Sequence, residues 1–188
     1  MHMNTKKLTG IAACVALMAV CSWISIPFAI PFAIPFTMQT FAVFVTIGLL
    51  GGRSATVAIG IYILMGAVGL PVFAGFSGGV GILFGNTGGY IIGFLFSALT
   101  MWLTEPIWKK NTGRFMLFEG LGMLVCYFFG TLWFMFLYTS NVGFGGFISV
   151  MSMCVVPFII PDAAKLVLAA VISRRVAKLL KLDREHAL

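Results

Sequence analysis

Charged residues are what this chain has least of. Only 9% of its 188 residues are charged, whereas 61% are hydrophobic and the mean hydropathy is +1.09. Soluble domains carry about 25% charged residues, so this composition excludes a soluble globular domain and predicts an integral membrane protein. The apolar runs are long enough to span a bilayer as helices, and the alternating pattern of an outer-membrane barrel is absent. We therefore expect an all-α membrane protein.

Residues that support enzyme chemistry are equally scarce. The two histidines, His2 and His186, lie in polar stretches, and the four cysteines lie within apolar segments without C-x-x-C spacing. These patterns exclude a metal site and a redox motif. No arrangement of nucleophile, base and orienting group is present, nor is a nucleotide-binding motif. The sequence therefore predicts a protein that is not an enzyme, holds no cofactor and does not itself hydrolyse ATP.

What the chain does have is a series of long apolar segments separated by basic residues. The net charge is +7. The basic residues are not interspersed with polar or aromatic residues that could contact nucleic-acid bases, so we expect no nucleic-acid partner. Six segments bounded by charge, proline or glycine are predicted to form a single transmembrane domain over residues 1–188. They cover about 8–26, 36–50, 54–70, 87–104, 115–138 and 148–173.

The basic residues also indicate the orientation of this six-helix bundle. Eleven of the twelve lysines and arginines precede the first segment, follow the last, or lie in the connections after the second and fourth. The three other connections, 27–35, 71–86 and 139–146, contain no charged residue. By the positive-inside rule, both termini are predicted to be cytoplasmic. Glu119 and three further acidic residues are assigned to the same side.

Asp162 and Lys165 are not explained by topology. They lie roughly 18 and 14 Å into a hydrocarbon core about 30 Å thick, where a charge costs about 2.5–3.5 kcal/mol. Their spacing of three puts them on one helix face, so they either neutralise each other and fix helix packing, or form the polar floor of a ligand pocket. Pro161, after Pro157, suits the first turn of a helix that follows broken backbone, which favours the pocket.

Other segments support a ligand site. The 71–86 connection is rich in glycine and apolar, which favours a lid over an apolar ligand. Gln39 is predicted either to bond between helices or to meet the ligand. Ala12 and Ala16 form a small-x-x-x-small pair that allows close approach of a helix, in this chain or in another one.

Four stretches together resemble the BioY family, the biotin-binding S components of energy-coupling factor (ECF) transporters. They are "IPFTMQT" (34–40), "GLPVFAGFSGG" (69–79), "TGGYIIGF" (87–94) and "PFIIPDAAKLVLAAVISRRV" (157–176). The resemblance implies six transmembrane helices in a bacterial or archaeal cytoplasmic membrane, and a biotin pocket on the extracellular side. It also implies docking onto a transmembrane T component, through a surface that includes Ala12 and Ala16, and onto two ATPases that use the ATP. The chain departs from the family pattern at Pro161, where a glycine is usual, and at Asn86, where a proline is usual.

Biotin suits these residues chemically. An ionised Asp162 can accept a hydrogen bond from a ureido N–H, and Lys165 can donate to the ureido oxygen or, alternatively, to the carboxylate. Asn86 is expected as a third contact to the ureido head. The rings and the valeryl chain of biotin are expected to pack against Phe73, Phe76 and Tyr90. Gln39 and the backbone N–H groups of the loop that contains Gly78 and Gly79 are expected near the carboxylate.

Two other functions stay open at this stage. One is an S component for another vitamin, such as riboflavin or thiamin. The other is a structural or assembly membrane protein in which Asp162 and Lys165 only hold helices together.

Overall fold

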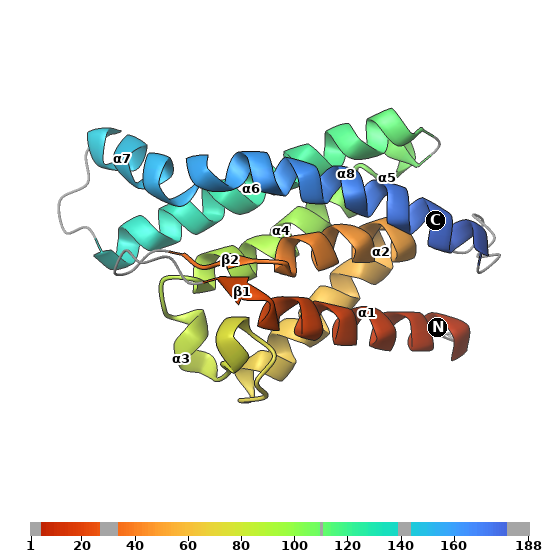
Figure 1. Cartoon of the computed structure of the whole chain (residues 1–188), viewed down its shortest axis with the longest axis horizontal. Helices are drawn as coiled ribbons and strands as arrows, with labels where there is room; N and C mark the ends of the chain where they lie inside the picture. Colours follow the sequence, from red (N-terminus) through yellow and green to blue (C-terminus); the bar gives the residue numbers. More distant parts are fainter. Residues whose placement is uncertain (1–4, 27–33, 110, 139–143, 180–188) are drawn as a thin grey trace.

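The architecture is almost entirely helical in this computed structural model, which describes residues 5–26, 34–109, 111–138 and 144–179 (Figure 1). The helices are α1 (Thr5–Trp23), α2 (Gln39–Ala67), α3 (Val80–Leu83), α4 (Gly88–Leu103), α5 (Glu105–Trp108), α6 (Thr112–Tyr138), α7 (Phe144–Cys154) and α8 (Val156–Leu179), with a 3-10 turn η1 (Ala74–Phe76). Two short strands, β1 (Ser25–Ile26) and β2 (Phe36–Thr37), pair antiparallel with Ser25 opposite Thr37. The all-helical expectation is confirmed.

Helix α2 lies at the centre of the bundle, where it packs against α1, α4 and α8, while α6 packs against α4, α7 and α8. Four helices, namely α1, α2, α6 and α8, are long and apolar enough to cross a membrane, and α4 is a shorter apolar helix. One side of α6 exposes large apolar side chains, which a bilayer would cover. They are Leu117, Leu121, Leu124, Phe128, Leu132 and Phe136.

The two expected spans 36–50 and 54–70 meet at a break inside α2. Gly51 has φ 73° and ψ 168°, which is not helical and lies in a region that favours glycine. The next residue, Gly52, packs directly against the backbone of Trp102 in α4, so a side chain there would collide with it. The two glycines therefore let the chain change direction and let α2 approach α4 closely, with a connection shorter than expected.

The helix expected over 148–173 is interrupted at Val155, so that the chain forms α7 and α8 in its place. Pro157 is the second residue of α8, where a missing N–H costs no helical bond. Pro161 lies inside α8 and not in its first turn as expected. Its ring nitrogen has no hydrogen for the carbonyl of Pro157, so one helical hydrogen bond is missing just before Asp162.

Glu119 is also placed differently from the expectation. Its side chain is completely buried in α6, and neither carboxyl oxygen has a hydrogen-bond partner within the described part of the chain. It therefore does not belong with the exposed charges of the cytoplasmic side. Its closeness to Arg114 in the sequence led to its assignment beside the cytoplasmic charges, near the start of the span expected over 115–138, but its position in α6, which begins at Thr112, buries it.

Candidate ligand-binding site

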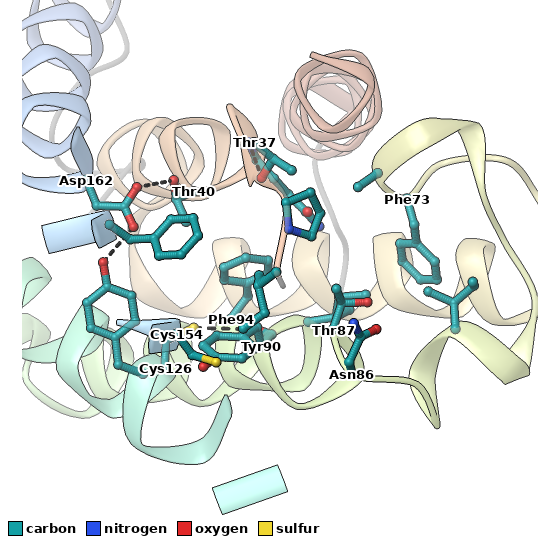
Figure 2. Close-up of a pocket in the computed structure, with 18 of the residues that line it drawn as sticks. Thr37, Thr40, Phe73, Asn86, Thr87, Tyr90, Phe94, Cys126, Cys154 and Asp162 are labelled. Atoms are coloured by element: carbon teal, nitrogen blue, oxygen red, sulfur yellow. Dashed lines mark hydrogen bonds between the residues drawn. The ribbon is translucent and has the colours of Figure 1, made fainter. Parts of the chain in front are cut away.

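A cavity of about 270 Å³ lies among α2, α4, α6, α7, α8 and the segment between α2 and α4 (Figure 2). This volume is near the lower end of the range for small-molecule sites, about 300–1,000 Å³, and suits a small metabolite. Its walls combine a charged group, apolar rings and a few polar side chains. The lining residues are Ile34, Pro35, Thr37, Gln39, Thr40, Phe73, Ala74, Ser77, Ile82, Asn86, Thr87, Tyr90, Ile91, Phe94, Cys126, Tyr127, Cys154, Phe158, Asp162 and Lys165.

One end of the cavity is formed by the ion pair on α8. Lys165 Nζ lies 2.8 Å from Asp162 Oδ1, and both side chains are almost fully buried. Asp162 Oδ1 also accepts a hydrogen bond from Thr40 Oγ1 at 3.0 Å, and Oδ2 accepts one from the Tyr127 hydroxyl at 2.6 Å. Because the pair is three residues apart on one helix face, both partners reach the same end of the cavity.

The ammonium group of Lys165 uses all three of its donors in this arrangement. Besides Asp162 Oδ1, it donates to the carbonyl of Thr37 at 2.7 Å and to Thr40 Oγ1 at 3.1 Å. It also lies 3.9 Å from the centre of the Phe36 ring, which adds a cation–π contact. The ion pair is therefore neutralised internally, and it links α8 to the β2–α2 junction.

The middle of the cavity is apolar. Figure 2 shows Phe94 between Asp162 and Asn86, and Cys126 donates a weak hydrogen bond from Sγ to the carbonyl of Tyr90 at 3.5 Å. Ile91 and Phe158 add apolar side chains to the lining. The Tyr90 hydroxyl is buried and has no hydrogen-bond partner among the residues described. A ligand with an apolar body therefore fits the middle better than a uniformly polar one.

The opposite end is formed by the start of α4 and the loop before it. Figure 2 shows Asn86, Thr87 and Phe73 on the side of the cavity away from Asp162. Ser77, in the same loop, also lines the cavity. The cavity thus offers two polar ends with an apolar section between them.

Hydrogen bonds from two helices hold this loop in place. The carbonyl of Val72 accepts bonds from Ser22 Oγ of α1 at 2.6 Å and from the Tyr62 hydroxyl of α2 at 2.8 Å. Gln39 Nε2 in turn donates to the Tyr62 oxygen at 2.8 Å. Trp23 Nε1 donates to the carbonyl of Pro71 at 2.7 Å. Gln39 therefore supports the loop as well as lining the cavity.

Six of the expected ligand contacts line this cavity, and three do not. The six are Gln39, Phe73, Asn86, Tyr90, Asp162 and Lys165. Phe76 is 63% exposed and stacks on Trp23, with ring centres 4.9 Å apart. Gly78 packs on the carbonyl of Leu70, and the N–H of Gly79 donates to the carbonyl of Gly66 at 2.7 Å. These two glycines shape the loop, and the Gly79 N–H is not available to a ligand.

The expected docking residues lie elsewhere. Ala12 and Ala16 are exposed on one side of α1, whereas Ile11, Cys14 and Val15 face the core. The small residues therefore do not serve packing within the described part of this chain.

Sequence reasoning did not identify Tyr127, Thr37 or Thr40 as parts of the site. A tyrosine within an apolar helix usually finds a hydrogen-bond partner, so Tyr127 at a similar depth to Asp162 was the available signal. Thr37 contributes a backbone carbonyl, for which side-chain identity gives no signal.

Within the described ranges, no group of three or more His, Cys, Asp or Glu residues is placed to hold a metal ion.

Comparisons with known proteins agree on one family. Residues 1–182 match the family model described as the BioY family. The chain is 38% identical over 174 residues to a biotin transporter BioY of Thermotoga maritima, covering 93% of this chain and 97% of the relative. It is 35% identical over 173 residues to a probable biotin transporter BioY of Pyrococcus horikoshii, with coverage of 92% and 97%. A crystal structure of the S-component for biotin from an ECF-type ABC transporter superposes with a TM-score of 0.80 at 28% identity, covering 95% of each chain.

Proposed function

The chain belongs to the BioY family, and we propose that it captures biotin and acts as the substrate-specific subunit of an ECF-type ABC transporter for biotin uptake. Curated relatives that align over nearly their whole length are named as biotin transporters, and the similar crystal structure is an S-component for biotin. The observation that carries the proposal within this chain is the cavity with a buried ion pair at one end and an apolar middle. This arrangement suits a molecule with a polar ureido head and a hydrocarbon chain.

The ureido head is assigned to the Asp162 end. A carboxylate has about four acceptor positions, and three of those on Asp162 are occupied by Lys165, Thr40 and Tyr127. One position remains for a ureido N–H. Because Lys165 already uses three donors, the ureido oxygen must replace one of its present acceptors, so binding exchanges hydrogen bonds at this end.

The carboxylate of biotin is assigned to the other end. Asn86 was expected beside the ureido head, but it lies across the cavity from Asp162 (Figure 2). We therefore assign Asn86, Thr87 and Ser77 to the carboxylate and the chain that carries it. Phe73 and Tyr90 would cover the apolar part of the ligand, and Gln39 would hold the loop in position.

In the membrane, we propose six spans, with the two parts of α2 as separate spans and with α7 and α8 together completing the last one. Both termini would be cytoplasmic, in a bacterial or archaeal cytoplasmic membrane. The exposed face of α1 with Ala12 and Ala16 would dock onto a T component. Two ATPase subunits would supply the energy.

The proposal is tested by calorimetric titration of biotin, riboflavin and thiamin into the detergent-purified chain and into Asp162→Asn and Lys165→Ala variants. We expect the parent to bind biotin and neither of the other vitamins. Each variant should lose roughly tenfold to a hundredfold in affinity, because a hydrogen bond to a charged group contributes about 1.5–3 kcal/mol. Lys109→Ala, a charge removal outside the cavity, is the matched control and should bind biotin like the parent.

Two outcomes would contradict the proposal. If the parent binds riboflavin or thiamin and not biotin, the ligand assignment is wrong. If no vitamin binds, and replacing both Asp162 and Lys165 with apolar residues of similar size leaves the protein equally stable, the pair has the purely structural role.

A further inference from the structure

Tyr127 is a cavity residue that the ligand assignment above leaves unused. It comes from α6, its side chain is buried, and its hydroxyl donates to Asp162 Oδ2 at 2.6 Å. The other oxygen of Asp162, Oδ1, is occupied by Lys165 and Thr40. Among the described residues, Tyr127 is thus the one that bonds Oδ2, the carboxylate oxygen that keeps an open acceptor position.

The direction of this bond determines what the corner of the cavity can recognise. Tyr127 has one hydroxyl hydrogen, and this hydrogen is already donated to Asp162. The phenol oxygen can therefore only accept a further bond, as can the remaining position on Asp162 Oδ2. A ligand group placed at this corner must donate a hydrogen bond, because an acceptor there would face two oxygens with no hydrogen to offer.

We propose that Tyr127 is a specificity-determining residue, which with Asp162 Oδ2 forms an acceptor-only corner that selects an N–H group of a cyclic urea. This inference rests on the proposed biotin binding and assigns one part of the recognition to one residue. The tyrosine acts in two ways. It holds the carboxylate in a single orientation, and it presents a second acceptor to the same N–H group.

Such a corner discriminates strongly against a ligand without the hydrogen. A site built to hydrogen-bond a substrate N–H leaves buried polar groups unpaired when that hydrogen is missing. Biotin methylated on one ureido nitrogen is the direct probe, because it keeps the rings and the valeryl chain and removes one donor. Biotin methyl ester is the matched control ligand, because its change lies at the opposite end of the cavity.

The experiment titrates biotin, the two singly N-methylated biotins and biotin methyl ester into the parent and into Tyr127→Phe. We expect the parent to reject at least one N-methylated ligand. In Tyr127→Phe, biotin should bind roughly tenfold to a hundredfold more weakly, and the preference for biotin over that N-methylated ligand should shrink by roughly tenfold. The ratio of biotin to methyl ester should stay as in the parent.

A double variant separates recognition from general destabilisation. Because Tyr127 acts through Asp162, adding Tyr127→Phe to Asp162→Asn should cause far less loss than in the parent. Equal weakening of all four ligands by Tyr127→Phe, or losses that simply add in the double variant, would overturn the inference and leave Tyr127 as a structural residue.

If Tyr127→Phe does not fold, 3-fluorotyrosine placed at position 127 keeps the hydroxyl. Its fluorine signal should then shift with biotin and not with the rejected N-methylated ligand, and the same shift with both would overturn the inference.

Failure of this inference is distinguishable from failure of the proposed function. If the parent does not bind biotin, both are wrong. If the parent binds biotin and its discrimination survives in Tyr127→Phe unchanged, only the role of Tyr127 is wrong.

Discussion

At the scale of single residues, two carboxyl groups buried in apolar helices have opposite surroundings. Asp162 receives hydrogen bonds from Lys165, Thr40 and Tyr127, so its charge is compensated. Glu119 is completely buried, and its oxygens have no hydrogen-bond partner in the described segments. Burial of a polar group is unfavourable unless a partner replaces the lost water. The two residues should therefore respond to substitution in opposite directions.

We expect Glu119→Met to stabilise the protein. Methionine has a similar length and no polar atoms, so the substitution removes an unsatisfied carboxyl group that costs about 1–3 kcal/mol. The measurement is the thermal midpoint of the detergent-purified chain, which should rise, with biotin affinity unchanged. Glu105→Met, at the partly exposed start of α5, is the matched control and should shift the midpoint little. A large fall for Glu119→Met alone would mean that the carboxyl group has a partner in the membrane-embedded protein.

The same residues show how far sequence reasoning reaches at this scale. Asp162 and Lys165 were identifiable because the positive-inside rule explained the other basic residues and left these two without a role. The burial of Glu119 was not predicted, because it follows Arg114 closely and distance along the chain does not show which side of a helix is buried. Tyr127 and Thr40 were missed because hydroxyl groups in apolar helices have no characteristic spacing.

At the scale of elements, the course of α2 depends on two adjacent glycines with different roles. Gly51 adopts a positive φ, and Gly52 lies against the backbone of Trp102. Sequence reasoning placed a boundary between two spans here because glycine and Arg53 interrupt an apolar run, and Gly51 has non-helical angles just before that boundary. It did not place the interruption at Val155: the prolines predicted broken backbone before Pro161, but no charge or glycine near Val155 marks the boundary between the two helices.

We expect Gly52→Ala to weaken the contact between α2 and α4. The added methyl group would overlap the Trp102 backbone, and such overpacking costs about 1–3 kcal/mol. Gly60→Ala is the matched control in the same helix, because nothing lies within 4 Å of the position its Cβ would take. The thermal midpoint should fall for Gly52→Ala and stay level or rise slightly for Gly60→Ala. Equal shifts in both would show that the close approach of α2 and α4 is not required.

At the scale of the whole molecule, the beginning of α1 and the end of α8 lie on the same side of the bundle (Figure 1). Exposed basic residues occur at this side, at Lys6 and Lys7 and at Arg175 and Lys178. The uncharged loop that carries Phe76 lies on α1 near its opposite end, where Phe76 stacks on Trp23. This arrangement supports the proposed orientation, with the ligand cavity toward the outside.

That orientation predicts where introduced cysteines react. The described part of the chain has four buried cysteines, so labelling of an exposed cysteine should dominate. In intact cells, a membrane-impermeant maleimide should label Phe76→Cys and should label Lys178→Cys only after the membrane is made permeable. Labelling of Lys178→Cys in intact cells, with Phe76→Cys labelled only after permeabilisation, would show that the topology is the opposite of the one proposed.

Because the exposed alanines of α1 lie apart from the cavity, the proposed docking onto a T component should be separable from ligand binding by substitution. Ala16 lies on the exposed face of α1, where a tryptophan would prevent the close helix approach that small residues allow. We expect Ala16→Trp to bind biotin like the parent in titrations, but to lose copurification with the T component and uptake that depends on it. Ala164→Trp, on the exposed side of α8, is the matched control because it adds the same bulk at a different surface. If both variants copurify normally, α1 is not the docking surface. If both fail, added bulk at the lipid-facing surface is itself disruptive, and the small residues of α1 have no special role.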